Sequence, residues 1–181
     1  MKRIIIGFAF LMLILGNVVS EDTNSGIIYG ENWAFMFSTP EGYVWDNVSL
    51  QHEGIWALFY KEGQDEFYGS KHHLYINPIP KGNGYPSTLE ELISWDISYF
   101  QKNDHDLKIS YYTEMQLSDT QKVKIYSFDQ DVRNYYMYFG YLTERNSSFI
   151  FVLISRTKEE REQTRKAYFD LIRNFRYFDI N

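Results

Sequence analysis

Histidine and acidic side chains are the first candidates for chemistry in this 181-residue sequence. His72 and His73 are adjacent in a stretch typical of a strand, so their side chains point to opposite faces and cannot chelate one metal ion together. Asp104, His105 and Asp106 are also ligand types, but consecutive residues rarely converge on one ion and Asp is common in turns. We therefore expect no metal ion and no other cofactor.

Other catalytic motifs are missing as well. The sequence contains no cysteine, which excludes disulfides, thiolate zinc sites and cysteine nucleophiles. It has no Gly-x-Ser-x-Gly elbow of a serine hydrolase, and the glycines Gly82 and Gly84 lack the Lys-Ser/Thr that completes a phosphate loop. The formal net charge of -6 argues against nucleic-acid binding, which needs a clustered basic face. The sequence thus favours a protein that is not an enzyme.

One enzymatic alternative remains open. A secreted or periplasmic hydrolase could use a pair of carboxyl groups supplied by Asp or Glu residues of the loops. Such an enzyme needs two neighbouring carboxyl groups in a cleft, held at different acidities. Carboxyl groups scattered over exposed helix faces would instead favour a binding protein.

Aromatic side chains are the most abundant residues that could make binding contacts, because 16 Tyr, 14 Phe and 4 Trp make up 19% of the chain. Strand alternation places Tyr136 and Tyr138 on one face of a predicted strand and Tyr135 on the other. If helices cover both faces of the sheet, these tyrosines fill the core and its rims. If a groove on the sheet stays open, they can bind a ligand there. We predict Tyr135, Tyr136 and Tyr138 as contact residues for a protein, peptide or glycan partner.

The elements that must position these residues alternate between two periodicities. Strand-like patterns occupy residues 33–38, 55–60, 74–76, 107–113, 122–128, 135–143 and 149–155. Helix starts are predicted at Ser87, with Glu90 in the capping-box position, and at Thr157, with Glu160 in that position. Strands, a helix, a meander of strands and a final helix predict an α+β fold with a central antiparallel sheet and helices packed on its faces.

The N-terminus has the pattern of a signal peptide. Lys2 and Arg3 precede an apolar run over residues 4–16 that is too short for a membrane span, and small side chains precede a cleavage point between Ser20 and Glu21. We predict cleavage there, export to the periplasm or the extracellular space, and no stable membrane insertion afterwards. A retained anchor helix is the alternative. Cleavage removes two basic residues and no acid, so the net charge becomes -8 instead of -6.

The mature chain is predicted to hold one domain. Residues 1–20 form the signal peptide, residues 21–30 are polar enough to form a flexible leader, and residues 31–181 form the domain. No internal repeat divides this length, which suffices for a single hydrophobic core.

Three segments resemble those of a known family. Residues 35–43 are similar to the opening strand and Pro-x-Gly-aromatic turn of the PsbP-like family, and residues 88–92 are similar to the start of its middle helix. Residues 152–156, with 174–176, resemble its closing strand and helix. The resemblance implies an α/β/α sandwich without an enzymatic motif. The family includes an extrinsic photosystem II subunit, a nuclear Ran-binding protein and bacterial exported proteins of unknown role, so it implies no particular partner.

Overall fold

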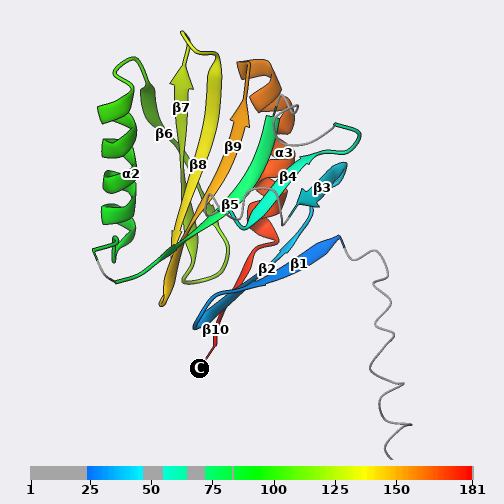
Figure 1. The fold of residues 1–181 in the computed structure, drawn as a ribbon, viewed down its shortest axis with the longest axis vertical. Helices are drawn as coiled ribbons and strands as arrows, with labels where there is room; N and C mark the ends of the chain where they lie inside the picture. Colours follow the sequence, from blue (N-terminus) through cyan, green and yellow to red (C-terminus); the bar gives the residue numbers. More distant parts are fainter. Residues whose placement is uncertain (1–23, 47–54, 65–71, 83, 181) are drawn as a thin grey trace, which may run out of the picture.

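A computed structural model of the chain describes residues 24–46, 55–64, 72–82 and 84–180. These residues form strands and helices in the order shown in Figure 1. The strands are β1 (Ser25–Tyr29), β2 (Trp33–Ser38), β3 (Tyr43–Asp46), β4 (Ala57–Lys61), β5 (His72–Pro80), β6 (Lys108–Gln116), β7 (Lys122–Gln130), β8 (Tyr135–Thr143), β9 (Ser147–Ser155) and β10 (Arg176–Asp179). The helices are α2 (Leu89–Asn103) and α3 (Lys158–Arg173).

The larger sheet has seven strands in the order β3-β4-β5-β9-β8-β7-β6, and every neighbouring pair is antiparallel. Its second half, β6 to β9, is the meander that the sequence predicted. Strand β9 lies between β5 and β8 and is buried over almost its whole length, because apolar side chains alternate onto both faces.

The smaller sheet has three strands in the order β1-β2-β10. It forms because β2 pairs with β1 along one edge and with β10, from the far end of the chain, along the other. Its aromatic residues reach the larger sheet: the ring of Phe35 lies 5.4 Å from that of Phe149, and the ring of Phe37 lies 5.1 Å from that of Phe59.

The helix starts follow from capping residues. Thr88, one residue later than the predicted cap Ser87, caps α2, because its hydroxyl accepts the backbone N–H of Glu91 at 3.2 Å. The carboxylate of Glu91 in turn accepts the backbone N–H groups of Ser87 and Thr88. Thr157 caps α3 as predicted, since its hydroxyl accepts the N–H of Glu160 at 3.1 Å.

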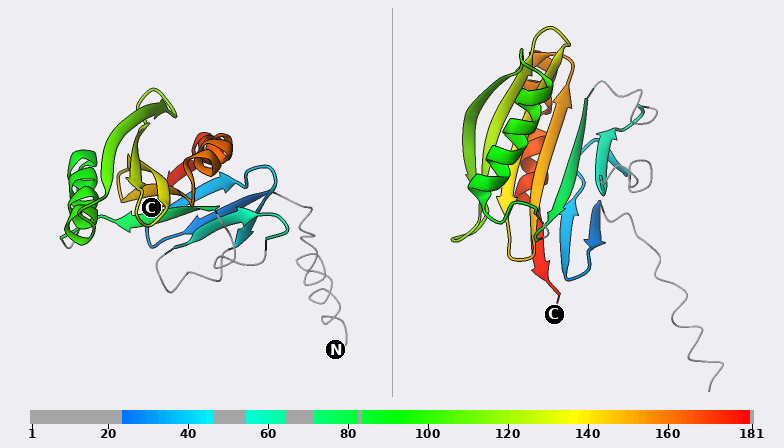
Figure 2. Two further views of the ribbon diagram at one scale, coloured as in Figure 1. Left: turned by 90° about the horizontal axis from the view of Figure 1, so that it is seen from above. Right: turned by 60° about the vertical axis from the view of Figure 1, so that its left-hand side comes forward.

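Two separate clusters of buried residues lie on the two faces of the larger sheet. Helix α2 packs on one face, over side chains that include Phe128, Phe139, Ile150 and Val152. Helix α3 and the smaller sheet share the other face, and Figure 2 shows the two helices on opposite sides of the strands. The expected α/β/α sandwich is therefore correct only in its coarser form. The central antiparallel sheet is present, but the molecule is mostly β, and a second sheet occupies much of one face.

The N-terminal predictions have two outcomes. Ser25–Tyr29 forms strand β1, so the expectation of a flexible leader over residues 21–30 is wrong there: pairing with β2 and burial of alternate side chains order the segment. The predicted signal peptide and its cleavage between Ser20 and Glu21 lie outside the described residues. In the part of the chain that is described, neither helix has the length and apolar character needed to cross a membrane.

Candidate functional site

A groove runs beside helix α2, on the side where the helix leaves strands β5 and β9 uncovered. Two adjoining cavities, of about 280 and 220 Å³, form the groove, and both are lined by Tyr99 and Phe100. Trp95 and Tyr99 stand at its edge, 46% and 61% exposed. We call this surface the α2 groove. Exposed large aromatic side chains next to a cavity are typical of contact surfaces.

The smaller cavity contains a buried carboxyl group. Asp96 is 7% exposed, and its Oδ2 accepts a hydrogen bond from the Tyr141 hydroxyl at 2.7 Å. Burial raises the pKa of Asp96 to about 6, although the Tyr141 hydrogen bond opposes the shift. Burial, together with the nearby Asp96 charge, also raises the pKa of Tyr141. At neutral pH the cavity therefore holds an ionised carboxylate beside neutral phenol groups.

The sequence analysis missed Asp96. The residue lies four positions after Leu92 and three after Ile93, so it falls on the apolar stripe that faces the sheet. A charged residue on a buried stripe was the signal that could have identified it, because buried carboxyl groups need a partner.

The three predicted contact tyrosines lie in different environments. Tyr135 is half-buried and lines the larger cavity of the α2 groove. Tyr136 is also half-buried, but its hydroxyl donates to Asp131 at 3.0 Å, away from the groove. Tyr138 is fully buried in the cluster beneath α3, so its prediction as a surface contact residue is wrong. Alternation had correctly separated Tyr135 from Tyr138, but α3 covers the face on which Tyr138 lies.

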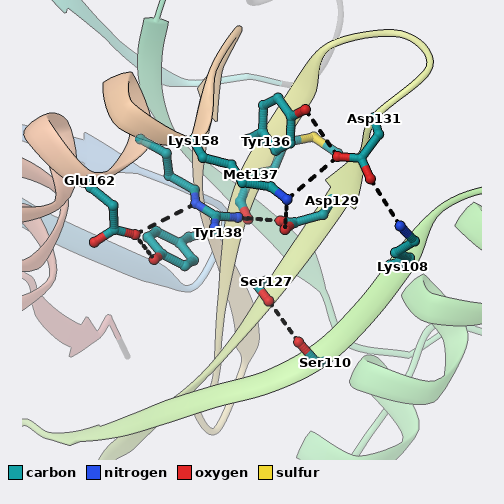
Figure 3. Close-up of polar contacts among 11 residues, drawn as sticks. Lys108, Ser110, Ser127, Asp129, Asp131, Tyr136, Met137, Tyr138, Lys158 and Glu162 are labelled. Carbon is teal, nitrogen blue, oxygen red and sulfur yellow. Dashed lines mark hydrogen bonds and ion pairs between the residues drawn. The ribbon is translucent and has the colours of Figure 1, made fainter.

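A cluster of charged residues lies at the start of β8, close to the point where α3 begins (Figure 3). Its centre is Arg161, only 8% exposed, whose guanidinium donates to Asp129 and lies 4.5 Å from the centre of the Tyr138 ring. The Tyr138 hydroxyl donates to Glu162 at 2.5 Å. Burial and this carboxylate raise the pKa of Tyr138.

Further ion pairs surround this centre. Lys158 lies 3.6 Å from Asp129 and 3.5 Å from Asp131, and Lys108 lies 2.9 Å from Asp131. The hydrogen bonds from Lys108 and Tyr136 lower the pKa of Asp131 to about 2. Each of these carboxylates thus has a cationic partner within the chain. The cluster connects α3 to the β7–β8 hairpin.

Two of the remaining candidates for chemistry, Asp104 and His73, make contacts within the fold, whereas His105 and Asp106 are exposed. Asp104 ends α2, and its carboxylate accepts a hydrogen bond from Gln130 at 2.6 Å and lies 3.6 Å from Arg133. His73 is buried in β5 with its ring 6.4 Å from that of Tyr75. Among the described residues, no group of three or more His, Asp or Glu side chains has the arrangement of a metal site.

Comparisons with known proteins identify the fold. No known family profile matches the chain, and no curated protein sequence matches it. Among solved structures, cyanobacterial PsbP (CyanoP) from Synechocystis sp. PCC 6803 is similar with a TM-score of 0.56 at 12% identity, over 91% of this chain and 99% of that one. A mutant of the protein Mog1 gives 0.51 at 11% identity, over 84% and 95% of the two chains. The Ran-binding protein Mog1p of Saccharomyces cerevisiae gives 0.50 at 9% identity, over 84% and 93%.

These similarities define the class: the chain has the PsbP-like fold, as the resemblance of its sequence segments implied. Identities of 9–12% establish the fold alone.

Proposed function

We propose that this protein is a non-catalytic binding module that contacts a partner protein through the α2 groove. The observation that carries the proposal is the exposure of Trp95 and Tyr99 beside two adjoining cavities. Large, rigid aromatic side chains contribute most of the binding energy of many protein interfaces. One protein of similar fold, yeast Mog1p, is a Ran-binding protein, which supports a protein over a glycan as the partner.

The charge distribution of the groove supports the same proposal. Asp96 lines the smaller cavity without a second carboxyl group among that cavity's described lining residues. Asp104 in the larger cavity is engaged by Gln130 and Arg133. The paired carboxyl groups that a hydrolase would need are therefore not what the groove presents.

We further propose that the protein acts after export, in the periplasm or outside the cell.

Alanine substitution in the groove tests the proposal. Partners are captured from an extract of the native host by cross-linking to the wild-type protein, and their affinities are then measured by calorimetry. Trp95→Ala and Tyr99→Ala should each weaken binding at least about fivefold, which corresponds to the 1 kcal/mol that separates important contacts from neutral ones. Tyr29→Ala is the matched control, because Tyr29 is 63% exposed but lies on the smaller sheet.

Two results would overturn the proposal. One is a partner whose affinity is unchanged by both groove substitutions. The other is turnover of a hydrolase substrate panel that disappears in Asp96→Asn, because that result would make the buried carboxyl group catalytic.

Tyr135→Ala extends the test to the larger cavity, whereas Tyr136→Ala reports on whether the contact surface continues around the β7–β8 hairpin.

A further inference from the structure

The smaller cavity of the α2 groove has an unusual lining. Aromatic rings from three elements surround it, and one buried carboxyl group faces it from α2. These residues are Tyr75, Trp95, Asp96, Tyr99, Phe100 and Phe139. Among the described residues that line it, none is Lys, Arg or His. The cavity thus combines aromatic rings with a negative charge, and its described lining residues supply no positive charge.

The carboxylate lacks a countercharge within the described structure. The Tyr141 hydroxyl is the hydrogen-bond donor to Asp96, and it engages Oδ2. Among the causes that shift the pKa of Asp96, burial is the largest and no cation contributes. An ionised carboxylate that is 7% exposed is costly unless a cation or further donors compensate it. A ligand that brings a positive charge would supply that compensation.

Contacts between cations and tyrosine rings elsewhere in the molecule illustrate the interaction that the smaller cavity could make with a ligand. Three tyrosines of β8 each have a cation over the ring, at 4.5 Å for Arg156 on Tyr135 and at 5.2 Å for Lys158 on Tyr136. The third is the Arg161–Tyr138 contact of the charged cluster. Aromatic rings attract ammonium groups and guanidinium groups in this way, and cages of such rings bind ammonium ligands. The rings of the smaller cavity have the same capacity with no basic side chain lining the cavity.

We propose that the smaller cavity of the α2 groove binds the ammonium group of a lysine side chain presented by the partner protein. The proposal rests on the proposed function and names the chemistry of its central contact. A volume of about 220 Å³ is below the range of roughly 300–1,000 Å³ typical of sites for whole small molecules, so one side chain fits better.

The carboxylate geometry favours lysine over arginine. Tyr141 occupies one oxygen of Asp96, which leaves the other oxygen for the ligand. A guanidinium group binds best to both oxygens of a carboxylate at once, whereas an ammonium group is a compact charge that needs only one. The net charge of -6 also attracts a basic partner.

The experiment uses single-residue probes and NMR titration of the full chain. The probes are Nα-acetyl-lysine methylamide, its norleucine counterpart, which keeps the apolar stem without the charge, and its arginine counterpart. Tetramethylammonium represents a small free ammonium ligand that no partner protein supplies. We expect the lysine probe to shift the Trp95 indole resonance and to bind at least tenfold more tightly than the norleucine probe.

Two variants with the same change in charge give the matched comparison. Asp96→Asn should weaken the lysine probe at least tenfold, while Asp119→Asn, an exposed carboxyl group on the β6–β7 turn, should change its affinity less than twofold. Equal binding of the norleucine probe, or an unchanged affinity in Asp96→Asn, would overturn the proposal. Tighter binding of the arginine probe or of tetramethylammonium than of the lysine probe would overturn the choice of lysine.

Failure of this proposal is distinguishable from failure of the proposed function. If no probe binds but Trp95→Ala still weakens the partner, the groove is a contact surface that does not take an ammonium group. If the lysine probe binds but Trp95→Ala leaves the partner unaffected, the cavity binds ammonium groups and the partner contacts another surface.

Discussion

Replacing Asp96 by Asn should make the protein more stable at neutral pH. Burial raises the pKa of this carboxyl group from 3.8 to about 6 in the folded protein. A carboxyl group whose folded pKa is raised binds its proton more tightly when folded, so its ionised form opposes folding. The penalty is absent below about pH 3.8, develops between pH 3.8 and about 6, and is complete above that range.

The magnitude follows from the two pKa values. Because one pKa unit corresponds to about 1.4 kcal/mol, the complete penalty is roughly 3 kcal/mol, and at pH 4.5 it falls to about 1 kcal/mol. Asn is close to Asp in shape and its carbonyl oxygen can still accept the Tyr141 hydroxyl, but it carries no charge. The variant should therefore exceed the wild type by about 3 kcal/mol at pH 7.5 and by about 1 kcal/mol at pH 4.5.

Urea unfolding followed by circular dichroism at these two pH values measures the difference. The change between pH 7.5 and pH 4.5, about 2 kcal/mol, does not depend on how well the amide packs, since packing contributes equally at both pH values. Asp119→Asn should alter stability by less than about 0.5 kcal/mol, as exposed substitutions usually do. A stability difference that is the same at both pH values, or a variant that is less stable at pH 7.5, would refute the reasoning.

Three further predictions concern other parts of the chain. Tyr141→Phe should destabilise the protein by about 1.5–3 kcal/mol at pH 7.5, because it removes a hydrogen-bond donor to the charged Asp96. The same substitution should cost less in the Asp96→Asn variant, and a double-mutant cycle by urea unfolding measures both costs. Arg161→Ala should cost about 1.5–3 kcal/mol, because it removes the buried donor to Asp129 and leaves that carboxylate only the half-exposed Lys158. Lys108→Ala, at a pair exposed on both sides, should cost less than about 1 kcal/mol, and equal losses in thermal unfolding would contradict this. N-terminal sequencing of protein from the native host should begin at Glu21, and a chain that begins at Met1 would exclude the predicted cleavage.

Local signals in the sequence were sufficient for most of the fold. Thr157 with Glu160 predicted the start of α3 because capping depends on residues only three positions apart. Strand 33–38 was predicted with the bounds that β2 has, since alternating aromatic residues define both its period and its burial. The start of α2 was placed one residue early because Ser87 and Thr88 are both good caps, and both backbone N–H groups bind Glu91.

Features that depend on distant parts of the chain could not be predicted in this way. Strand β1 contains Gly26 and polar flanks, and its order depends on pairing with β2 and on burial of Ile28 in the core. Burial of Tyr138 depends on α3 packing over that face of the sheet, which alternation alone does not determine. The role of Asp96 required Tyr141, 45 positions away in the sequence, to be brought beneath α2. In each case the deciding partner belongs to another element.

Strand β2 joins segments from opposite ends of the chain, because its second edge pairs with β10. A ribosome releases β2 early and β10 only after every strand of the seven-stranded sheet has emerged. Until then Phe35 lacks its neighbour Tyr177, and the packing of its ring against Phe175 cannot form. Contacts between such distant segments slow folding, because the long intervening chain must be ordered first. Strand β10 therefore acts as a closing step, and the domain stays incompletely folded until residues 176–179 have been synthesised.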